Sequence, residues 1–202
     1  VRDIADKLLA IYAERARQQG HAMGPPTAMY DHFVANFPWQ ETRDQLRAID
    51  DVLGDMQRQR PMDRLVCGDV GFGKTEVALR AACLAVLDGK QVAVLVPTVV
   101  LAEQHRVTFE ARFADLPIVV EGLTRTRTAQ KARVIREGLA SGQVDIVIGT
   151  HRLLSDKTAF KDLGLLIIDE EHRFGVTHKE RIKGIKPDVD VLTLSATPIP
   201  RT

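Results

Sequence analysis

The sequence predicts an α/β protein with a doubly wound, mostly parallel sheet and an N-terminal helical extension. Short runs that are apolar at nearly every residue alternate along the chain with longer segments of helical periodicity. Strands that are apolar on every residue are covered on both faces. Helices between successive strands are typical of parallel sheets. The expected strands span residues 65–67, 91–96, 118–120, 144–148, 165–168 and 191–194.

The expected helices fill the intervals between these strands. They begin near residues 42, 73, 98 and 128, and they end near residues 57, 82, 113 and 140. Residues 1–19 have the periodicity of an amphipathic helix, and the Gly- and Pro-containing stretch 21–26 indicates a linker or turn. We therefore divide the chain into an N-terminal helix and linker, 1–36, and a main domain, 37–202. The first helix either packs on the main domain or connects it to another one.

A glycine-rich segment follows the first strand and opens the next helix. It consists of Gly68, Asp69, Val70, Gly71, Phe72, Gly73, Lys74 and Thr75. The spacing matches the phosphate-binding loop pattern, in which glycines let backbone N–H groups turn inward around phosphate oxygens. The helix N-terminus adds a partial positive charge. Lys74 is positioned to reach the β- and γ-phosphates, and Thr75 to place its hydroxyl on Mg²⁺.

Polar segments follow the other strands at their carboxyl ends. In a doubly wound sheet these ends meet at one edge, where ligands bind. The convergence therefore predicts a single catalytic edge. The segments are Pro97-Thr98, Gly149-Thr150-His151, Asp169-Glu170-Glu171-His172 and Ser195-Ala196-Thr197.

Two adjacent carboxylates end the apolar run 165–168. Asp169 is expected to hold Mg²⁺ through water and so to complete the metal shell begun by Thr75. Glu170 is expected to orient and deprotonate the water that attacks the γ-phosphate. An acidic pair alone is a weak signal, since many helices begin with acids. Its combination with the phosphate loop makes the prediction specific.

Phe37 and Gln45 are candidates for reading an adenine base. An aromatic ring can stack on the base, and a Gln amide can pair with adenine N6 and N7. Gln45 has a competing structural role, because Thr42 and Gln45 match a helix capping box. The spacing by itself leaves both roles open.

Composition excludes some classes of protein and leaves others open. The chain has 202 residues, a net charge of +1 and 45% hydrophobic residues, which is typical of a globular protein. No apolar stretch has the roughly 20 residues needed to span a bilayer. Cys67 and Cys83 are expected to be buried small hydrophobes in a reducing compartment, the cytoplasm. No Cys/His cluster has zinc spacing, and His105 and His178 are expected to be surface or capping residues.

The order of these motifs resembles superfamily 2 helicases and translocases over nearly the whole chain. Within that superfamily, residues 62–77, 169–176 and 197–202 resemble the family of bacterial transcription-repair coupling factors. RecG-type fork-remodelling helicases are the nearest relatives. The resemblance implies that residues 37–202 form the first of two RecA-like ATPase lobes. Both ends of the chain look cut from a longer protein, with the second lobe absent.

The resemblance also implies roles for single residues. Phe37 and Gln45 resemble the adenine-recognition motif, and Lys74, Asp169, Glu170 and His172 resemble the catalytic group. His172, Ser195, Ala196 and Thr197 resemble elements that couple nucleotide state to DNA grip. Arg125 and Arg127 lie where relatives also place basic residues, although a solvated charged turn explains them equally well. The residues resembling nucleic-acid backbone contacts are Pro97, Thr98, Gln104, Thr150 and His151.

The implied activity is ATP- and Mg²⁺-dependent translocation on double-stranded DNA that displaces stalled RNA polymerase and couples transcription to excision repair. RNA polymerase and the repair proteins are expected to bind other domains. The isolated chain is expected to hydrolyse ATP feebly, because the second lobe carries the arginine finger. One alternative is a branched-DNA helicase, and another is a nucleotide-dependent interaction module without useful hydrolysis. A small-molecule kinase does not explain residues 169–172 and 195–197.

Overall fold

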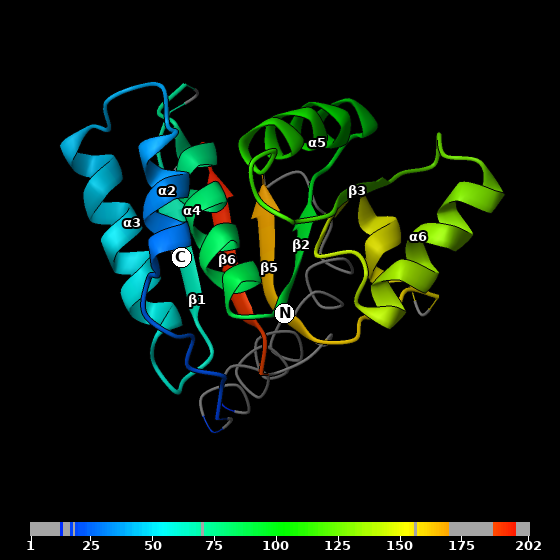
Figure 1. Cartoon of the computed structure of the whole chain (residues 1–202), viewed down its shortest axis with the longest axis horizontal. Helices are drawn as coiled ribbons and strands as arrows, with labels where there is room; N and C mark the ends of the chain where they lie inside the picture. The colour runs from blue at the N-terminus through cyan, green and yellow to red at the C-terminus, as the bar shows by residue number, and fades with distance from the viewer. Residues whose placement is uncertain are drawn as a thin grey trace, which may run out of the picture.

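A computed structural model describes residues 13, 17, 19–69, 71–155, 157–169 and 188–196. The described strands are β1 (Asp63–Cys67), β2 (Gln91–Leu95), β3 (Val120–Leu123), β4 (Ile146–Gly149), β5 (Leu163–Asp169) and β6 (Asp190–Ser195). They form one sheet in the order β1-β6-β5-β2-β4-β3, and every pairing is parallel (Figure 1). The predicted fold class is therefore confirmed.

Each predicted strand is present, and β3 and β4 each begin two residues later than expected. Just before β3, the backbone N–H of Val119 donates to the Asp145 carboxylate at 2.8 Å, and β3 starts at the following residue. The helices are α2 (Ala28–Ala35), α3 (Arg43–Met56), α4 (Lys74–Leu87), α5 (Val99–Arg112) and α6 (Ala129–Ser141). A short 3-10 helix, η1, spans His151–Leu154.

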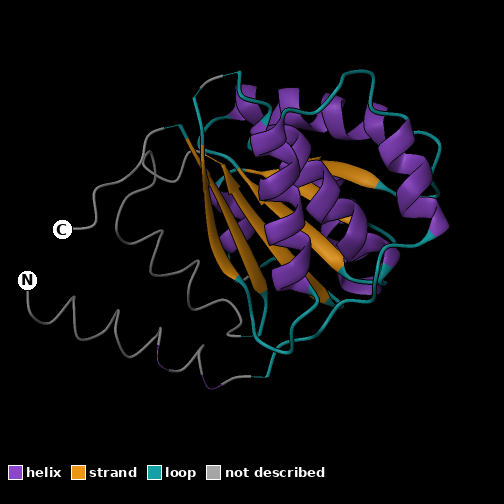
Figure 2. Ribbon diagram, turned by 90° about the vertical axis from the view of Figure 1, so that its left-hand side faces the viewer, coloured by secondary structure: helices purple, strands orange, loops and turns teal. Residues whose placement is uncertain are grey.

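The sheet is covered on both faces, as alternating side chains of its central strands show. Val92 and Val94 of β2 belong to a core shared with α2, α3, α4 and α5. Ala93 and Leu95 belong to a second core, shared with α6 and η1. Figure 2 shows helices stacked against the sheet. This two-sided burial explains why the central strands are apolar at every residue.

Strand β1 departs from the expectation of burial on both faces. It pairs only with β6, so it lies at an edge of the described sheet. Leu65 is 40% exposed and Cys67 is exposed. The prediction of two buried cysteines is therefore correct for Cys83 and wrong for Cys67, because Asp63, Leu65 and Cys67 lie on one face of β1 and that face is exposed.

The segment before α3 packs on the main domain where the structure describes it. The backbone N–H of Met23 donates to Met56 O at 3.0 Å, and that of Gly24 donates to the Asp88 carboxylate at 2.9 Å. Tyr30 and Phe33 are buried in the core shared with α4. The predicted helix over 1–19 lies mostly outside the described residues, and the division at residue 36 stays a prediction.

None of the described helices is long and apolar enough to span a membrane.

Candidate nucleotide-binding site

The carboxyl ends of the central strands meet at one edge, as predicted. Parallel register pairs Cys67 with Ser195 and Asp169 with Leu194. The backbone N–H of Gly68, the first residue of the glycine-rich segment, donates to Ser195 O at 3.1 Å. The start of the phosphate loop and the end of β6 are thus joined directly.

The glycine-rich segment has the backbone conformation that its glycines permit. Gly71 and Gly73 have φ values of 89° and 70°, in the left-handed region that side chains disfavour. Gly73 is the N-cap of α4, so the unsatisfied N–H groups of this helix face the loop. A Cβ at Gly73 would clash with the Gln45 amide nitrogen. Val70 lies outside the described residues.

Lys74, the first residue of α4, folds back over the loop. Its ammonium group donates to the carbonyls of Gly68 and Asp69, the latter at 2.7 Å. The charge therefore lies at the mouth of the loop, within reach of an anion bound there. Thr75 follows on α4 and is half-buried, and Phe72 at the loop tip is 45% exposed.

Gln45 is both a helix cap and a neighbour of the phosphate loop. Its backbone N–H donates to Thr42 Oγ1, and its side-chain Oε1 accepts from the Thr42 N–H at 2.7 Å, which completes the capping box. The other end of the same amide donates to Phe72 O at 3.0 Å. The capping role is confirmed, and it holds the amide against the loop. Adenine reading by Gln45 stays a prediction.

Phe37, the other adenine-reading candidate, packs on two guanidinium groups. The centre of its ring lies 5.7 Å from the Arg80 guanidinium carbon and 5.5 Å from that of Arg112. Trp39 packs edge-on against it, with ring centres 5.6 Å apart. Cation–π contacts of this kind orient an aromatic ring. The half-buried Phe37 is thus fixed beside the helix that follows the phosphate loop.

A buried ion-pair network supports that ring. Arg80 Nε donates to Glu76 at 2.6 Å, and its terminal nitrogen pairs with Glu41. Arg112 of α5 donates to the same Glu76 oxygen at 2.9 Å. The hydrogen bond from Arg80 lowers the pKa of Glu41. Burial raises the pKa of Tyr30, beside this network, to about 12.

The carboxylate of Asp169 contacts a histidine that the sequence analysis did not assign to the site. Asp169 follows Leu165 and Ile167 at two-residue spacing, which places it on the sheet face covered by α4 and α5. His105 Nε2 lies 2.8 Å from Asp169 Oδ2. His105 is only 9% exposed, so its prediction as a surface or capping residue is wrong. Glu170 and His172 lie outside the described residues.

The sequence contained a usable signal for His105. Ala102, His105 and Phe109 are the buried residues of α5 and lie at helical spacing. A polar side chain on such a stripe needs a partner in the core. The partner itself is 64 residues away in the chain, so sequence alone does not identify it.

The residues at this edge fit Mg²⁺ held mainly by phosphate and water oxygens. Within the described ranges, no three His, Cys, Asp or Glu side chains cluster as a dedicated metal site. Mg²⁺ commonly takes one or two protein ligands plus substrate phosphates. Thr75 on α4 and Asp169 on β5, whose two elements pack together, supply one hydroxyl and one carboxylate.

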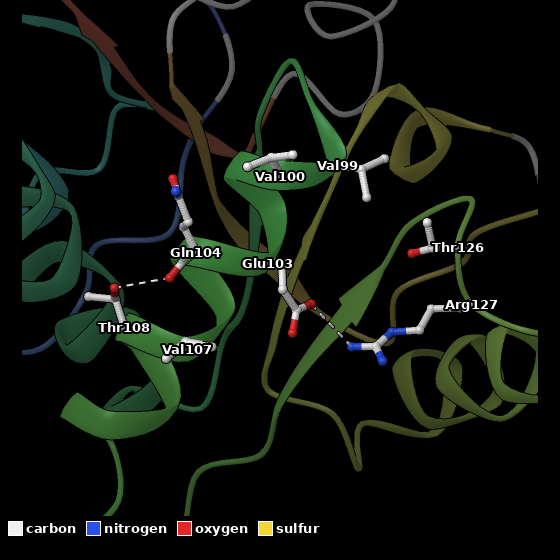
Figure 3. A pocket seen from close by; sticks show the side chains of 8 residues that line it. All are labelled: Val99, Val100, Glu103, Gln104, Val107, Thr108, Thr126 and Arg127. Carbon is white, nitrogen blue, oxygen red and sulfur yellow. Dashed lines mark hydrogen bonds and ion pairs between the residues drawn. The ribbon is translucent and has the colours of Figure 1, made fainter.

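The candidate DNA contacts differ in how accessible they are. Gln104 and Arg127 line a groove of about 800 Å³ between α5 and the turn before α6 (Figure 3). Arg127 pairs with Glu103 at 3.6 Å, while Arg125 is exposed. The remaining candidates are exposed Thr98, which caps α5 by accepting from the Leu101 N–H, half-buried Pro97, buried Thr150 and exposed His151.

Two of the coupling candidates, Ser195 and Ala196, lie at the end of β6. Ser195 is fully buried and Ala196 is half-buried. Thr197 lies outside the described residues. The link between Ser195 O and the Gly68 N–H places this strand end directly beneath the phosphate loop.

An all-parallel sheet with a phosphate loop after one strand and a carboxylate at the end of another defines a RecA-like lobe of the phosphate-loop class. The chain belongs to the DEAD/DEAH box helicase family, whose sequence profile matches residues 42–202. This agrees with the resemblance to superfamily 2 proteins.

Comparison with individual proteins is more specific than the match to the helicase family. The chain is 62% identical over its full length to the transcription-repair-coupling factor of Bacillus subtilis (strain 168) and 58% identical to that of Staphylococcus epidermidis (strain ATCC 12228 / FDA PCI 1200). It spans 17% of the length of each. These matches confirm the predicted resemblance to coupling factors.

A solved structure is similar across almost the whole chain. RecG bound to a three-way DNA junction aligns with a TM-score of 0.83 and 38% identity, covering 98% of this chain and 27% of RecG. The predicted relationship to RecG is confirmed as well.

Proposed function

We propose that this chain is the first ATP-binding lobe of an ATP-dependent double-stranded DNA translocase. The main support is one observation: the phosphate loop and Asp169 come from different strands of one sheet and lie at the same edge. A lobe of this kind brings the phosphates and the metal ligand together without any further domain.

In this proposal each residue acts on a defined part of the nucleotide. When the nucleotide binds, the Lys74 ammonium group leaves the carbonyls of Gly68 and Asp69 and donates to the β- and γ-phosphates instead. Asp169 and Thr75 would hold Mg²⁺, which would supply positive charge to neutralise the phosphate oxygens. Gln45 and Phe37 read the adenine base, and their capping and guanidinium contacts fix them in advance.

Hydrolysis requires the residues that follow Asp169. Glu170 orients the attacking water, and His172 with Ser195-Ala196-Thr197 links the nucleotide state to DNA grip. Glu170 directly follows the last residue of β5 in the chain, and Ala196 directly follows the last residue of β6, which supports the assignment. The DNA backbone contacts seven candidate residues of this lobe. These are Pro97, Thr98, Gln104, Arg125, Arg127, Thr150 and His151. Buried Thr150 is the weakest of these candidates, because contact requires exposure.

For the whole protein, we propose displacement of stalled RNA polymerase and coupling of transcription to nucleotide excision repair in the cytoplasm. Identities of 56–62% to proteins named as coupling factors support this role. RNA polymerase and repair proteins bind through other domains, and a second RecA-like lobe supplies an arginine finger. Such a finger contributes about 10³–10⁵ in rate, so the first lobe alone hydrolyses ATP feebly.

A thermal shift with Mg-ADP tests the nucleotide site. At 100 times Kd a ligand adds about 2.7 kcal/mol, which for a chain of this size corresponds to about 5–10 °C. Lys74→Ala removes the phosphate contact and abolishes the shift. Lys131→Ala, which removes an exposed lysine of α6, preserves it. A full shift in Lys74→Ala contradicts the proposed site.

The similarity to RecG favours one alternative, a branched-DNA helicase. Remodelling of a three-way junction by the full-length protein, without displacement of RNA polymerase, supports that alternative.

The other alternative, a nucleotide-dependent interaction module, is distinguished from a motor by Glu170→Gln in the full-length protein. This substitution abolishes turnover and retains binding in a motor, whereas it changes little in a switch that does not use hydrolysis.

A further inference from the structure

His105 is a buried titratable residue that the proposed function leaves without a role. It lies in the middle of α5, is 9% exposed, and directs Nε2 at Asp169 Oδ2 from 2.8 Å. Burial of an imidazole in a helix–sheet interface is unfavourable unless its nitrogens are paired. The contact therefore accounts for the burial of His105, and it engages the residue proposed as the metal ligand.

The imidazole is held in one orientation by an aromatic row on the same helix. Its ring packs edge-on against Phe109, with centroids 6.2 Å apart, and Phe109 packs against Phe113 at 6.1 Å. Phe109 and Phe113 are almost fully buried. A ring wedged in this way has little rotational freedom, so it acts as a fixed hydrogen-bonding group.

The hydrogen bond has a defined direction and leaves one carboxylate oxygen available. An ionised carboxylate offers only acceptors, so His105 Nε2–H donates to Oδ2 of Asp169. The donated bond restricts the rotamer of the carboxylate through Oδ2, and Oδ1 is the oxygen that can serve as a metal ligand. Partners of metal ligands commonly act in this way, by orienting the ligand.

We propose that His105 is a positioning residue for Asp169. It orients the Asp169 carboxylate so that this carboxylate binds the Mg²⁺ ion that accompanies the nucleotide. This inference rests on the proposed function, because it takes Asp169 as the metal ligand. Thr98, the N-cap of the same helix, and Gln104 within it are both exposed. The hydrogen bond thus joins the helix with candidate DNA contacts to the metal ligand.

The test is a titration with a fluorescent ADP analogue, once in EDTA and once over a series of Mg²⁺ concentrations. His105→Phe keeps the ring shape and cannot donate, whereas His105→Gln retains an N–H donor. We expect equal affinities in EDTA for the wild type and both variants. The Mg²⁺ concentration that gives half of the metal-dependent gain rises about tenfold or more in His105→Phe. His105→Gln recovers most of the difference.

Two further variants separate positioning from general disturbance. His21 contacts the Asp88 carboxylate, which lies between the end of α4 and the start of β2. This is the amino-terminal end of the strand, opposite the catalytic edge, so His21→Phe is a control that leaves the Mg²⁺ response unchanged. Asp169→Asn removes the ligand, and His105→Phe added to it has no further effect on the Mg²⁺ response.

The outcomes distinguish the two proposals. An unchanged Mg²⁺ response in a folded His105→Phe variant overturns the positioning role and leaves the nucleotide site intact. Absence of nucleotide binding by the wild type in both buffers overturns the proposed function and the positioning role together. If His105→Phe fails to fold, His105→Gln compared with His105→Asn, whose shorter amide does not reach Asp169, decides the question. Equal Mg²⁺ responses of those two variants overturn the proposal.

Discussion

Replacement of Arg80 by methionine should destabilise the chain strongly. Arg80 and Glu76 have side chains only 4% exposed, and Arg80 joins Glu76 at 2.6 Å while also pairing with Glu41. Removal of one partner of a buried pair typically costs about 3–5 kcal/mol, because the other charge is left in a poorly solvating environment. Arg112 still contacts Glu76 at 2.9 Å, so we expect about 3 kcal/mol.

This cost is measurable by thermal or urea unfolding. For a chain of 150–250 residues about 3 kcal/mol corresponds to a fall in Tm of about 6–12 °C. The matched control is Arg133→Met in α6. Arg133 and Glu137 have the same i,i+4 spacing, but their side chains are 78% and 61% exposed. Such surface pairs contribute little, so we expect no measurable change in Tm.

Equal stability of the Arg80→Met and Arg133→Met variants would refute the reasoning. It would mean that the buried network contributes no more than a solvated pair. A large loss in both variants would equally contradict it, since the argument depends on the difference in burial.

Three further predictions concern pH, thiol reactivity and the phosphate loop. The hydrogen bond from Arg80 lowers the pKa of Glu41 in the folded chain. The contribution of Glu41 to folding stability is therefore fully present above the unfolded pKa of about 4.3 and is lost as the pH falls through the folded pKa. The stability gap between wild type and Glu41→Gln, measured by urea unfolding, should therefore narrow in acid. Burial raises the pKa of Cys83 to about 12, so a thiol reagent should modify exposed Cys67 quickly and Cys83 only on unfolding; rapid labelling of both contradicts the structure. Gly73→Ala should abolish the Mg-ADP thermal shift, because φ is +70° there and the added Cβ meets the Gln45 amide.

Local pattern was enough to predict much of this protein. The phosphate-loop spacing, the capping box of Thr42 and Gln45, and the alternation of strands and helices are all short-range features. Each depends on residues within a few positions of one another, so the chemistry that produces the structure is visible in a short window. The shared edge of Asp169 and the phosphate loop followed from the rule that parallel strands end on the same side.

Contacts between distant segments were decided by the tertiary structure. The strand order places β6, the last described strand, beside β1, and no local signal specifies that order. The exposure of Cys67 was missed for a similar reason, since the apolar run 65–67 does not show that one face of β1 is left exposed in the folded chain.

The same distinction between local pattern and tertiary contacts applies to the candidate site. The sequence determined that a phosphate loop, an acidic strand end and an adenine-reading candidate exist on one α/β lobe. Only the folded chain decided that His105 donates to Asp169 and that Arg80 and Arg112 share Glu76 beneath Phe37. The His105–Asp169 and Arg112–Glu76 contacts join different elements and depend on distances of about 3 Å. A helical or strand period predicts which face a side chain occupies, but the packing of one element on another fixes the partner it meets.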